Sequence, residues 1–221
     1  VDSIVSGYLL EKIMLNRGYD VKYIIPDKEI SKESEDLCNK YNLYLGKYKN
    51  NDLVSDANYI LVDHNVREVP GKVVAIIDHH PAENVKAKYS KIENASSTAC
   101  MIAMECEEEL EKHDIELACL ATFVDTASFH SSKTRKSDMS WINEMCTKYD
   151  FDYDDMYRDG LCLTELKNVD DILFNGLKKY DFDGFHIHSS YIQVNDINNV
   201  DNLIEEILTK LQEYFLDNDI N

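Results

Sequence analysis

Two short apolar runs, each ending in an aspartate followed by a histidine, constrain the fold of this chain more than any other feature. Residues 59–62 and 73–77 are apolar and have the length and composition of strands buried in a parallel sheet. The first run continues into the letters DHN from Asp63, and the second into DHH from Asp78. Because ligands bind beyond the carboxyl ends of the strands in open α/β sheets, we expect these side chains to meet at one edge.

A third apolar run, at residues 117–124, reads equally well as a strand or as a buried helix, and it ends in Asp125. An aspartate at one such ending is usually a helix cap or a loop residue, but three endings of this kind favour a shared site. Carboxylates and imidazoles without a thiolate suit ions such as Mn²⁺, Mg²⁺ or Co²⁺. Two such ions side by side form a clamp for phosphoryl hydrolysis, so the pattern predicts a metal-dependent phosphoesterase.

The elements between these runs indicate the fold class. Residues 3–16 and 31–41 carry apolar side chains at helical spacing, and residues 21–26 between them are predicted to form a strand. Strands that alternate with helices are typical of a parallel sheet with helices on both faces. We therefore predict an α/β fold with a doubly wound parallel sheet.

The C-terminal part has a different pattern. Helical periodicity covers residues 137–149, about 154–163 and 199–216, while residues 184–194 alternate like a strand. We expect one large domain at 1–163, a linker at 164–175 and part of a smaller α/β domain at 176–221, because so little chain remains for a second domain. The chain opens without an initiator methionine, so we also expect further sequence before Val1.

The charge of the chain limits its partners. The 42 acidic and 23 basic residues give a formal net charge of −19, which repels nucleic acid and anionic membranes. The same field would repel a phosphate substrate unless bound cations reverse its sign locally. We therefore expect a small anionic substrate and bound divalent cations, with no nucleic-acid or membrane partner.

The cysteines indicate the compartment. None of the six lies in a C-x-x-C pair, and several lie within apolar stretches, as Cys119 does. Buried, reduced thiols explain this pattern better than disulfides or a zinc site, and they predict a cytoplasmic protein. No run approaches the roughly 18 apolar residues that span a membrane.

Several motifs of the chain resemble those of the DHH phosphoesterase superfamily. VDHN at residues 62–65 and IDHH at 77–80 lie about 15 residues apart, as two of its motifs do. The opening VDSIVSGYLL resembles the end of the first motif, and FVDTASF at 123–129 resembles the fourth. Within the superfamily the chain is most similar to the manganese-dependent (family II) inorganic pyrophosphatases, with the related exopolyphosphatases next. Residues 184–198 resemble the first strand of their second domain, called DHHA2.

The resemblance implies a role for each motif residue. Asp63 and Asp125 correspond to ligands that bridge two Mn²⁺ ions, with Co²⁺ or Mg²⁺ as alternatives, and Asp2 and His79 complete the second ion's site. Two ligands of the first ion's site would precede Asp2, at positions before Val1. His80 would lie beside the phosphate and the bridging water, and Asp78 would orient the histidines.

Basic residues for the substrate are fewer. Lys167 resembles the linker lysine that contacts phosphate in the pyrophosphatases, although an exposed lysine at a helix end explains it nearly as well. Lys133, Arg135 and Lys136 follow Asp125, and we expect them to face solvent. The letters SST at residues 96–98 open an apolar helix, where capping is a commoner role than anion binding.

The resemblance implies the hydrolysis of inorganic pyrophosphate to two phosphates by a water molecule held between two metal ions. One alternative is an exopolyphosphatase, and a second is a catalytically impaired metal-binding or scaffold protein. A homodimer is a further expectation. The glycine-rich GGGH motif of the oligonucleotide-degrading branch has no counterpart in the chain, which disfavours that branch.

Overall fold

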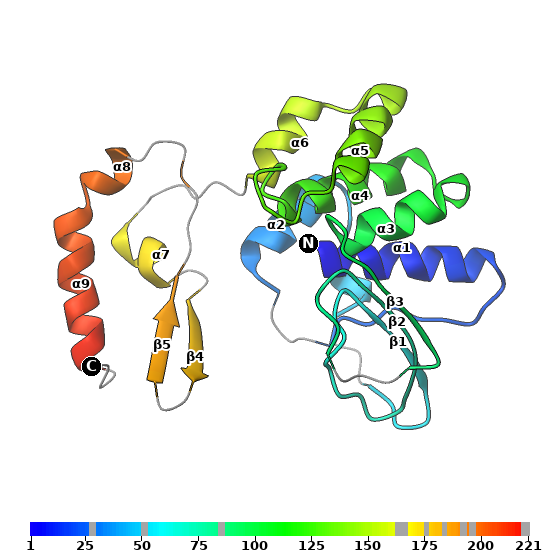
Figure 1. Cartoon of the computed structure of the whole chain (residues 1–221), viewed down its shortest axis with the longest axis horizontal. Coiled ribbons are helices and arrows are strands. Elements are labelled where there is room, and N and C mark those ends of the chain that lie inside the picture. The colour runs from blue at the N-terminus through cyan, green and yellow to red at the C-terminus, as the bar shows by residue number, and fades with distance from the viewer. Residues whose placement is uncertain are drawn as a thin grey trace. The chain divides into compact units, whose positions relative to one another are not determined.

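The computed structural model describes residues 1–26, 30–49, 53–83, 87–161, 168–174, 177–182, 185–190, 194 and 198–217. The chain forms two compact units, Val1–Leu161 and Cys162–Asn221, shown in Figure 1 in blue to yellow-green and in yellow to red. The domain limits at 1–163, 164–175 and 176–221 stay a prediction. Within the stretch predicted to be a linker, the structure has a short helix, α7 (Val169–Phe174).

The N-terminal unit contains a parallel three-stranded sheet in the order β1-β2-β3. Strand β1 is Asn58–Val62, β2 is Lys72–Asp78 and β3 is Tyr89–Ile92. Val62 pairs with Ile77, so the two Asp-His endings follow neighbouring strands and leave the sheet at the same edge. The parallel sheet and the α/β class are therefore confirmed. Strand β3 has the sequence YSKI, whose mixture of polar and apolar residues carries no strand pattern.

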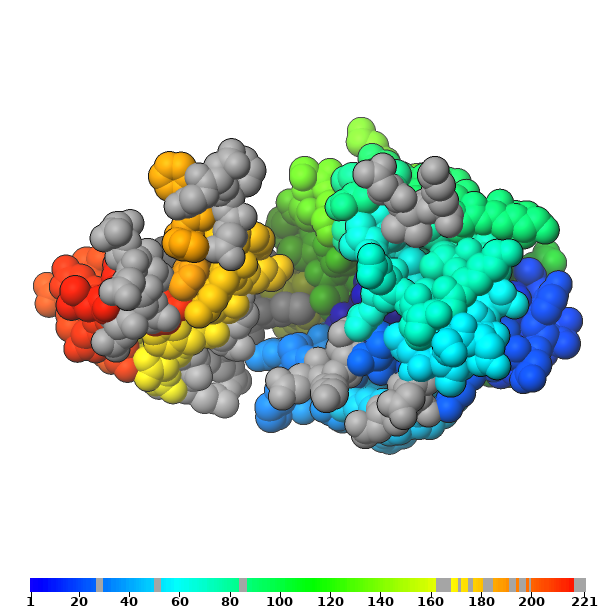
Figure 2. All heavy atoms as spheres, turned by 90° about the horizontal axis from the view of Figure 1, so that it is seen from below, coloured from blue at the N-terminus to red at the C-terminus, as the bar shows by residue number. Residues whose placement is uncertain are grey.

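The sheet is less buried than its apolar sequence predicts. In the two main strands only Leu61, Ile76 and the terminal Asp78 are buried, and the other residues are half-buried or exposed. In the space-filling view of Figure 2, the cyan part of the chain that includes β1 and β2 lies at the surface of the N-terminal unit. The core lies instead among the helices.

The helices of the N-terminal unit are α1 (Asp2–Asn16), α2 (Lys32–Lys40), α3 (Thr98–Glu105), α4 (Lys112–Asp125), α5 (Lys136–Tyr149) and α6 (Tyr153–Gly160), with short 3-10 turns η1 (Leu45–Lys47) and η2 (Glu107–Glu109). Helix α4 is central and packs against α1, α3, α5 and α6. Leu117, Leu120 and Phe123 are fully buried on it. A helix covered on nearly all sides has no polar face, which explains why its sequence reads equally well as a strand.

Polar contacts fix the start of α4 to α1. The fully buried carboxylate of Asp114 accepts hydrogen bonds from Tyr8 Oη at 2.9 Å and from Lys12 Nζ at 2.7 Å. Burial and the hydrogen bond to Asp114 raise the pKa of Tyr8 to about 12. Because α1 begins at Asp2 and α4 ends at Asp125, this anchor sets the relative position of two candidate metal ligands.

The prediction of a strand at residues 21–26 is wrong. This segment has no regular secondary structure and pairs with no strand among the described residues, and its backbone amides find other partners. Ile25 N donates to Tyr48 O at 3.0 Å, and Tyr23 N donates to the Glu11 carboxylate at 2.7 Å. Ile25 is buried, and the backbone N–H groups of Tyr23 and Ile25 are hydrogen-bonded. The segment therefore has the apolar sequence of a strand but meets its backbone requirements without joining a sheet.

The C-terminal unit is a small α/β arrangement of its own. Besides α7 it contains the antiparallel strands β4 (Lys178–Phe182) and β5 (Phe185–Ser189) and the helices α8 (Asn198–Asp201) and α9 (Ile204–Asp217). Helix α9 packs on α7, where the rings of Phe174 and Tyr214 lie 5.1 Å apart. The strand predicted at 184–194 and the helix predicted at 199–216 correspond to β5 and α9. No described helix combines the length and apolar character needed to cross a bilayer.

Candidate metal centre

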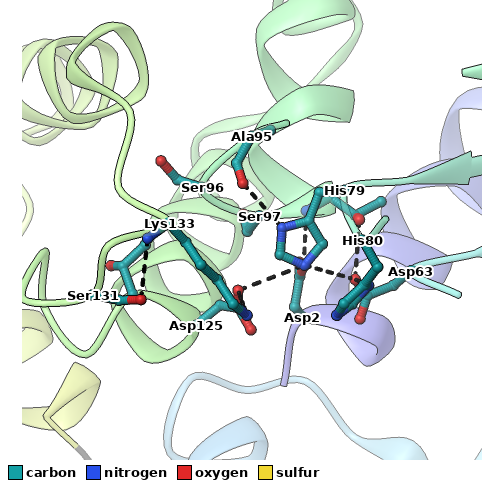
Figure 3. A network of polar contacts seen from close by, with 12 residues as sticks. Asp2, Asp63, His79, His80, Ala95, Ser96, Ser97, Asp125, Ser131 and Lys133 are labelled. Atoms are coloured by element: carbon teal, nitrogen blue, oxygen red, sulfur yellow. Dashed lines mark hydrogen bonds and ion pairs between the residues drawn. The ribbon is translucent and has the colours of Figure 1, made fainter. Parts of the chain in front are cut away.

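His79 lies at the middle of the candidate site, directly after β2. Its Nδ1 lies 3.0 Å from Ala95 O, so this nitrogen donates and the other, Nε2, carries a lone pair. Nε2 is buried and has no hydrogen-bond partner in the described part of the chain. It faces three carboxylates, at 3.4 Å from Asp63, 3.6 Å from Asp125 and 3.8 Å from Asp2, as Figure 3 shows.

This arrangement fits a divalent cation. A lone pair and three carboxylates that face one another repel, and a buried acceptor without a donor is costly. Ligand atoms that share one ion at metal–ligand distances of about 2.1 Å lie roughly 3.0–3.4 Å apart, and the separations of 3.4–3.8 Å around Nε2 equal or slightly exceed this range. Two described groups have their ligand atoms within 4.8 Å of one another: Asp2, His79 and Asp125, and Asp63, His79 and His80. Oxygen and imidazole donors without thiolate select hard-to-borderline ions.

Asp63 is held in position by two hydroxyl groups and an unusual backbone. Ser3 Oγ donates to its Oδ2 at 2.5 Å, and Thr98 Oγ1 donates to its Oδ1 at 3.0 Å. Its φ of 62° lies in the left-handed region, while its N–H still bonds Ile77 O at 2.9 Å. Aspartate tolerates this region better than most residues, and strain of this kind is concentrated at functional sites.

Asp2 begins α1 and lies against the first turn of α3. Its carboxylate accepts the backbone N–H groups of Thr98 and Ala99 at 2.8 and 2.9 Å, and Ser6 Oγ at 3.1 Å. Burial and the neighbouring charge of Asp63 raise the pKa of Asp2 well above its usual range, although the Ala99 N–H opposes the shift. A helix N-terminus offsets part of this cost, and a bound cation would offset more. The backbone N–H groups at the start of α3 therefore bind the carboxylate of Asp2.

Asp78 and His80 form a hydrogen-bonded pair beside the carboxylate cluster. Asp78 is fully buried, and its carboxylate accepts the His80 backbone N–H at 3.1 Å, the His80 ring Nδ1 at 2.8 Å and Asn65 Nδ2 at 2.5 Å. Burial alone would raise the pKa of Asp78, but these hydrogen bonds lower it, so the carboxylate stays ionised. The half-exposed His80 ring therefore keeps Nε2 free to face solvent or substrate. Asp78 orients His80, whereas Ala95 O orients His79.

Asp125 ends α4 and makes an ion pair that the sequence analysis did not predict. Lys133 Nζ lies 3.0 Å from its Oδ2, so this lysine faces the site and not solvent alone. The chain turns back immediately after Asp125 through Ala127, Ser128 and Phe129, which have φ angles of 46°, 51° and 69°. Three consecutive non-glycine residues in the left-handed region are strained, because L-residues visit it singly. The strained turn brings Lys133 back to the carboxylate.

The structure brings together Asp2, Asp63, His79, His80 and Asp125, with Asp78 behind His80. His64 was expected beside them, but its Nδ1 contacts Val62 O at 2.9 Å and it belongs to neither described metal-binding group. Lys167 lies outside the described residues.

Sequence reasoning missed the groups that hold the ligands in place: Ser3, Asn65, Ala95 and Thr98. Asn65 is the third letter of the DHN motif, which was a usable signal, and it also accepts Glu83 N at 2.9 Å. Thr98 was noticed only as part of a helix cap. That interpretation is confirmed for Ser97, whose Oγ accepts Cys100 N at 3.0 Å.

A buried cluster of carboxylates and a histidine at the edge of a parallel sheet is the arrangement of a metal-dependent phosphoesterase. Residues 1–126 match the DHH family, N-terminal domain, which is more than half of the chain. The chain belongs to the DHH family and is a hydrolase that depends on divalent metal.

A solved structure has a fold similar to that of this chain. A Methanococcus jannaschii protein described as a candidate family II inorganic pyrophosphatase superposes with a TM-score of 0.60 at 21% sequence identity. The similarity covers 87% of this chain and 69% of that one. At this identity the likeness supports the fold alone. Among curated proteins, no sequence matches the chain.

Proposed function

We propose that the protein hydrolyses inorganic pyrophosphate to two phosphates with Mn²⁺ as its divalent metal. The observation that carries this proposal is the buried, unpartnered Nε2 of His79, which faces the carboxylates of Asp2, Asp63 and Asp125. Bound in this cluster, divalent cations supply Lewis-acid activation of water and neutralise the charge of the phosphates. Membership of the DHH family and the likeness to the Methanococcus jannaschii fold support the proposal.

The residues around the cluster have separate tasks in this proposal. Asp2, Asp63 and Asp125 provide the anionic oxygens that hold the cations, and His79 adds a neutral nitrogen. His80, oriented by its 2.8 Å hydrogen bond to Asp78, directs Nε2 toward a phosphate oxygen, where it accepts or donates a proton.

The size of the substrate distinguishes the proposal from its main alternative. An exopolyphosphatase needs the same cluster but a longer basic surface for its polymer, and the chain's net charge of −19 weighs against such a surface. A metal-binding or scaffold protein that has lost catalysis is the second alternative, but such a protein has no need for a His80 ring held in one orientation beside the cluster.

Phosphate release by the full-length protein tests the three alternatives. With Mn²⁺ present, we expect pyrophosphate to be hydrolysed with a kcat/KM about 10²-fold above that for tripolyphosphate, the scale on which a pocket discriminates substrates of different size. Preferential hydrolysis of tripolyphosphate would support the exopolyphosphatase instead. Binding of Mn²⁺ without release of phosphate from either compound would support the metal-binding or scaffold protein.

A further inference from the structure

Lys133 occupies a position that the metal cluster does not need for its own assembly. Its Nζ lies 3.0 Å from Asp125 Oδ2, and this same oxygen lies 3.6 Å from His79 Nε2. The ammonium group therefore touches an oxygen that faces the candidate cation position, as Figure 3 shows. The lysine side chain is 44% exposed, so it can leave this oxygen without opening the core.

The basic residues that follow Lys133 have other positions. The guanidinium of Arg135 donates to Asn94 O and Ser137 Oγ and lies 3.4 Å from the Asp138 carboxylate. Lys136 is exposed at the start of α5. Among the described residues, Lys133 is the one lysine or arginine that contacts a carboxylate of the cluster.

The backbone holds Lys133 close to the site while its side chain remains free to move. Lys133 N donates to Ser131 Oγ at 3.3 Å, and Thr134 N donates to Ser131 O at 3.1 Å, which closes a turn around it. Ser131 N in turn bonds Thr126 O at 2.8 Å, so the turn is fixed to the end of α4. Because the turn fixes the backbone of Lys133, the ammonium group can contact only groups that lie close to Asp125.

The charge around Lys133 differs between the metal-free site and the site with cations and substrate bound, and this difference determines which group its ammonium contacts. Without metal, the carboxylates of Asp125 and its neighbours attract the ammonium group. A divalent cation on Asp125 repels it, and a bound phosphoanhydride brings new negative oxygens to the same place. Lysine is a compact point charge that suits phosphate oxygens.

We propose that Lys133 is a substrate-binding residue that exchanges partners: it pairs with Asp125 while the cluster lacks metal and contacts a phosphate of the substrate once cations are bound. This role rests on the proposed function for the identity of the substrate. It adds to the site a phosphate contact from the N-terminal unit, beside those expected from elsewhere in the protein.

Binding measurements on the full-length protein separate the two halves of this exchange. Isothermal titration calorimetry would follow Mn²⁺ alone, and then imidodiphosphate, a pyrophosphate analogue, with Mn²⁺ saturating. In Lys133→Met we expect the Kd for imidodiphosphate to rise about ten- to hundred-fold, the range for a lost hydrogen bond to a charged group. The Kd for Mn²⁺ should stay equal or fall up to about five-fold, because an exposed ion pair no longer competes.

Two further variants serve as controls. Lys136→Met removes a nearby exposed charge and should leave both dissociation constants within about two-fold of the wild type, whereas Lys133→Arg should retain most of the affinity for imidodiphosphate. An unchanged Kd for imidodiphosphate in Lys133→Met would overturn the proposal, as would weaker binding of Mn²⁺ by the same factor as the analogue. A wild type that binds the analogue but releases no phosphate contradicts the proposed function and leaves this comparison decisive for Lys133.

Discussion

Replacing Asp125 or Asp63 by asparagine should lower phosphate release by the full-length protein by about 10²–10³-fold or more, while the fold persists. Each carboxylate faces His79 Nε2, Asp125 at 3.6 Å and Asp63 at 3.4 Å. Asparagine keeps the shape of the side chain but removes the negative charge and one acceptor oxygen. A carboxylate that would hold a divalent cation contributes its negative charge to binding, so the neutral amide cannot replace it.

Asp154→Asn is a matched control, because Asp154 is exposed in the first turn of α6. It should leave turnover within about two-fold of the wild type, as surface substitutions usually do. Circular dichroism and thermal unfolding of all three variants would establish that the fold is retained. Near-normal activity in both Asp125→Asn and Asp63→Asn would remove the assignment of these residues to the metal cluster.

Alanine at His79 and at His80 should have different effects, although the two residues are adjacent. His79→Ala removes a nitrogen that faces all three carboxylates, so we expect the Mn²⁺ affinity to fall about 10–100-fold or more. His80→Ala leaves the carboxylates in place and should instead lower kcat by about 10²–10⁴-fold, the scale of a lost proton-transfer group. Metal titration by calorimetry and steady-state phosphate release measure the two quantities separately.

His113→Ala provides the control for a lost imidazole, since His113 is a half-exposed residue in the first turn of α4 that pairs with Glu116. It should change neither the Mn²⁺ affinity nor kcat by more than about two-fold. Equal loss of Mn²⁺ in His79→Ala and His80→Ala would show that the division of roles is wrong. The 3.8 Å distance between His80 Nδ1 and Asp63 Oδ1 makes that outcome a meaningful alternative.

The sequence was sufficient to predict the parallel strands and the residues beyond them. An apolar run that ends abruptly in charged residues is a local pattern, and parallel pairing then brings the ends of β1 and β2 together without any further information. The burial of these strands was predicted less well, because coverage of a sheet depends on helices from distant parts of the chain. The same limit applies to residues 21–26, whose amides find partners in Tyr48 and Glu11.

The groups that support the site were largely beyond prediction from sequence. Ser3 and Thr98 reach Asp63 from α1 and α3, across 60 and 35 positions of sequence, and a hydroxyl in a helix carries no pattern that marks such a contact. Lys133 was expected in solvent because the strained turn at Ala127, Ser128 and Phe129 could not be foreseen from residues without glycine. Tertiary structure, and not local propensity, decides where such side chains point.

Anomalous X-ray scattering from crystals grown with Mn²⁺ would locate the metal ion independently of any activity. We expect an anomalous peak at the manganese edge within about 2.0–2.4 Å of His79 Nε2 and of carboxylate oxygens from Asp2, Asp63 and Asp125. Lys133 Nζ should then no longer contact Asp125. A cluster without such a peak at saturating Mn²⁺, with the His79 ring and the carboxylates unchanged, would contradict the assignment of this site as a metal centre.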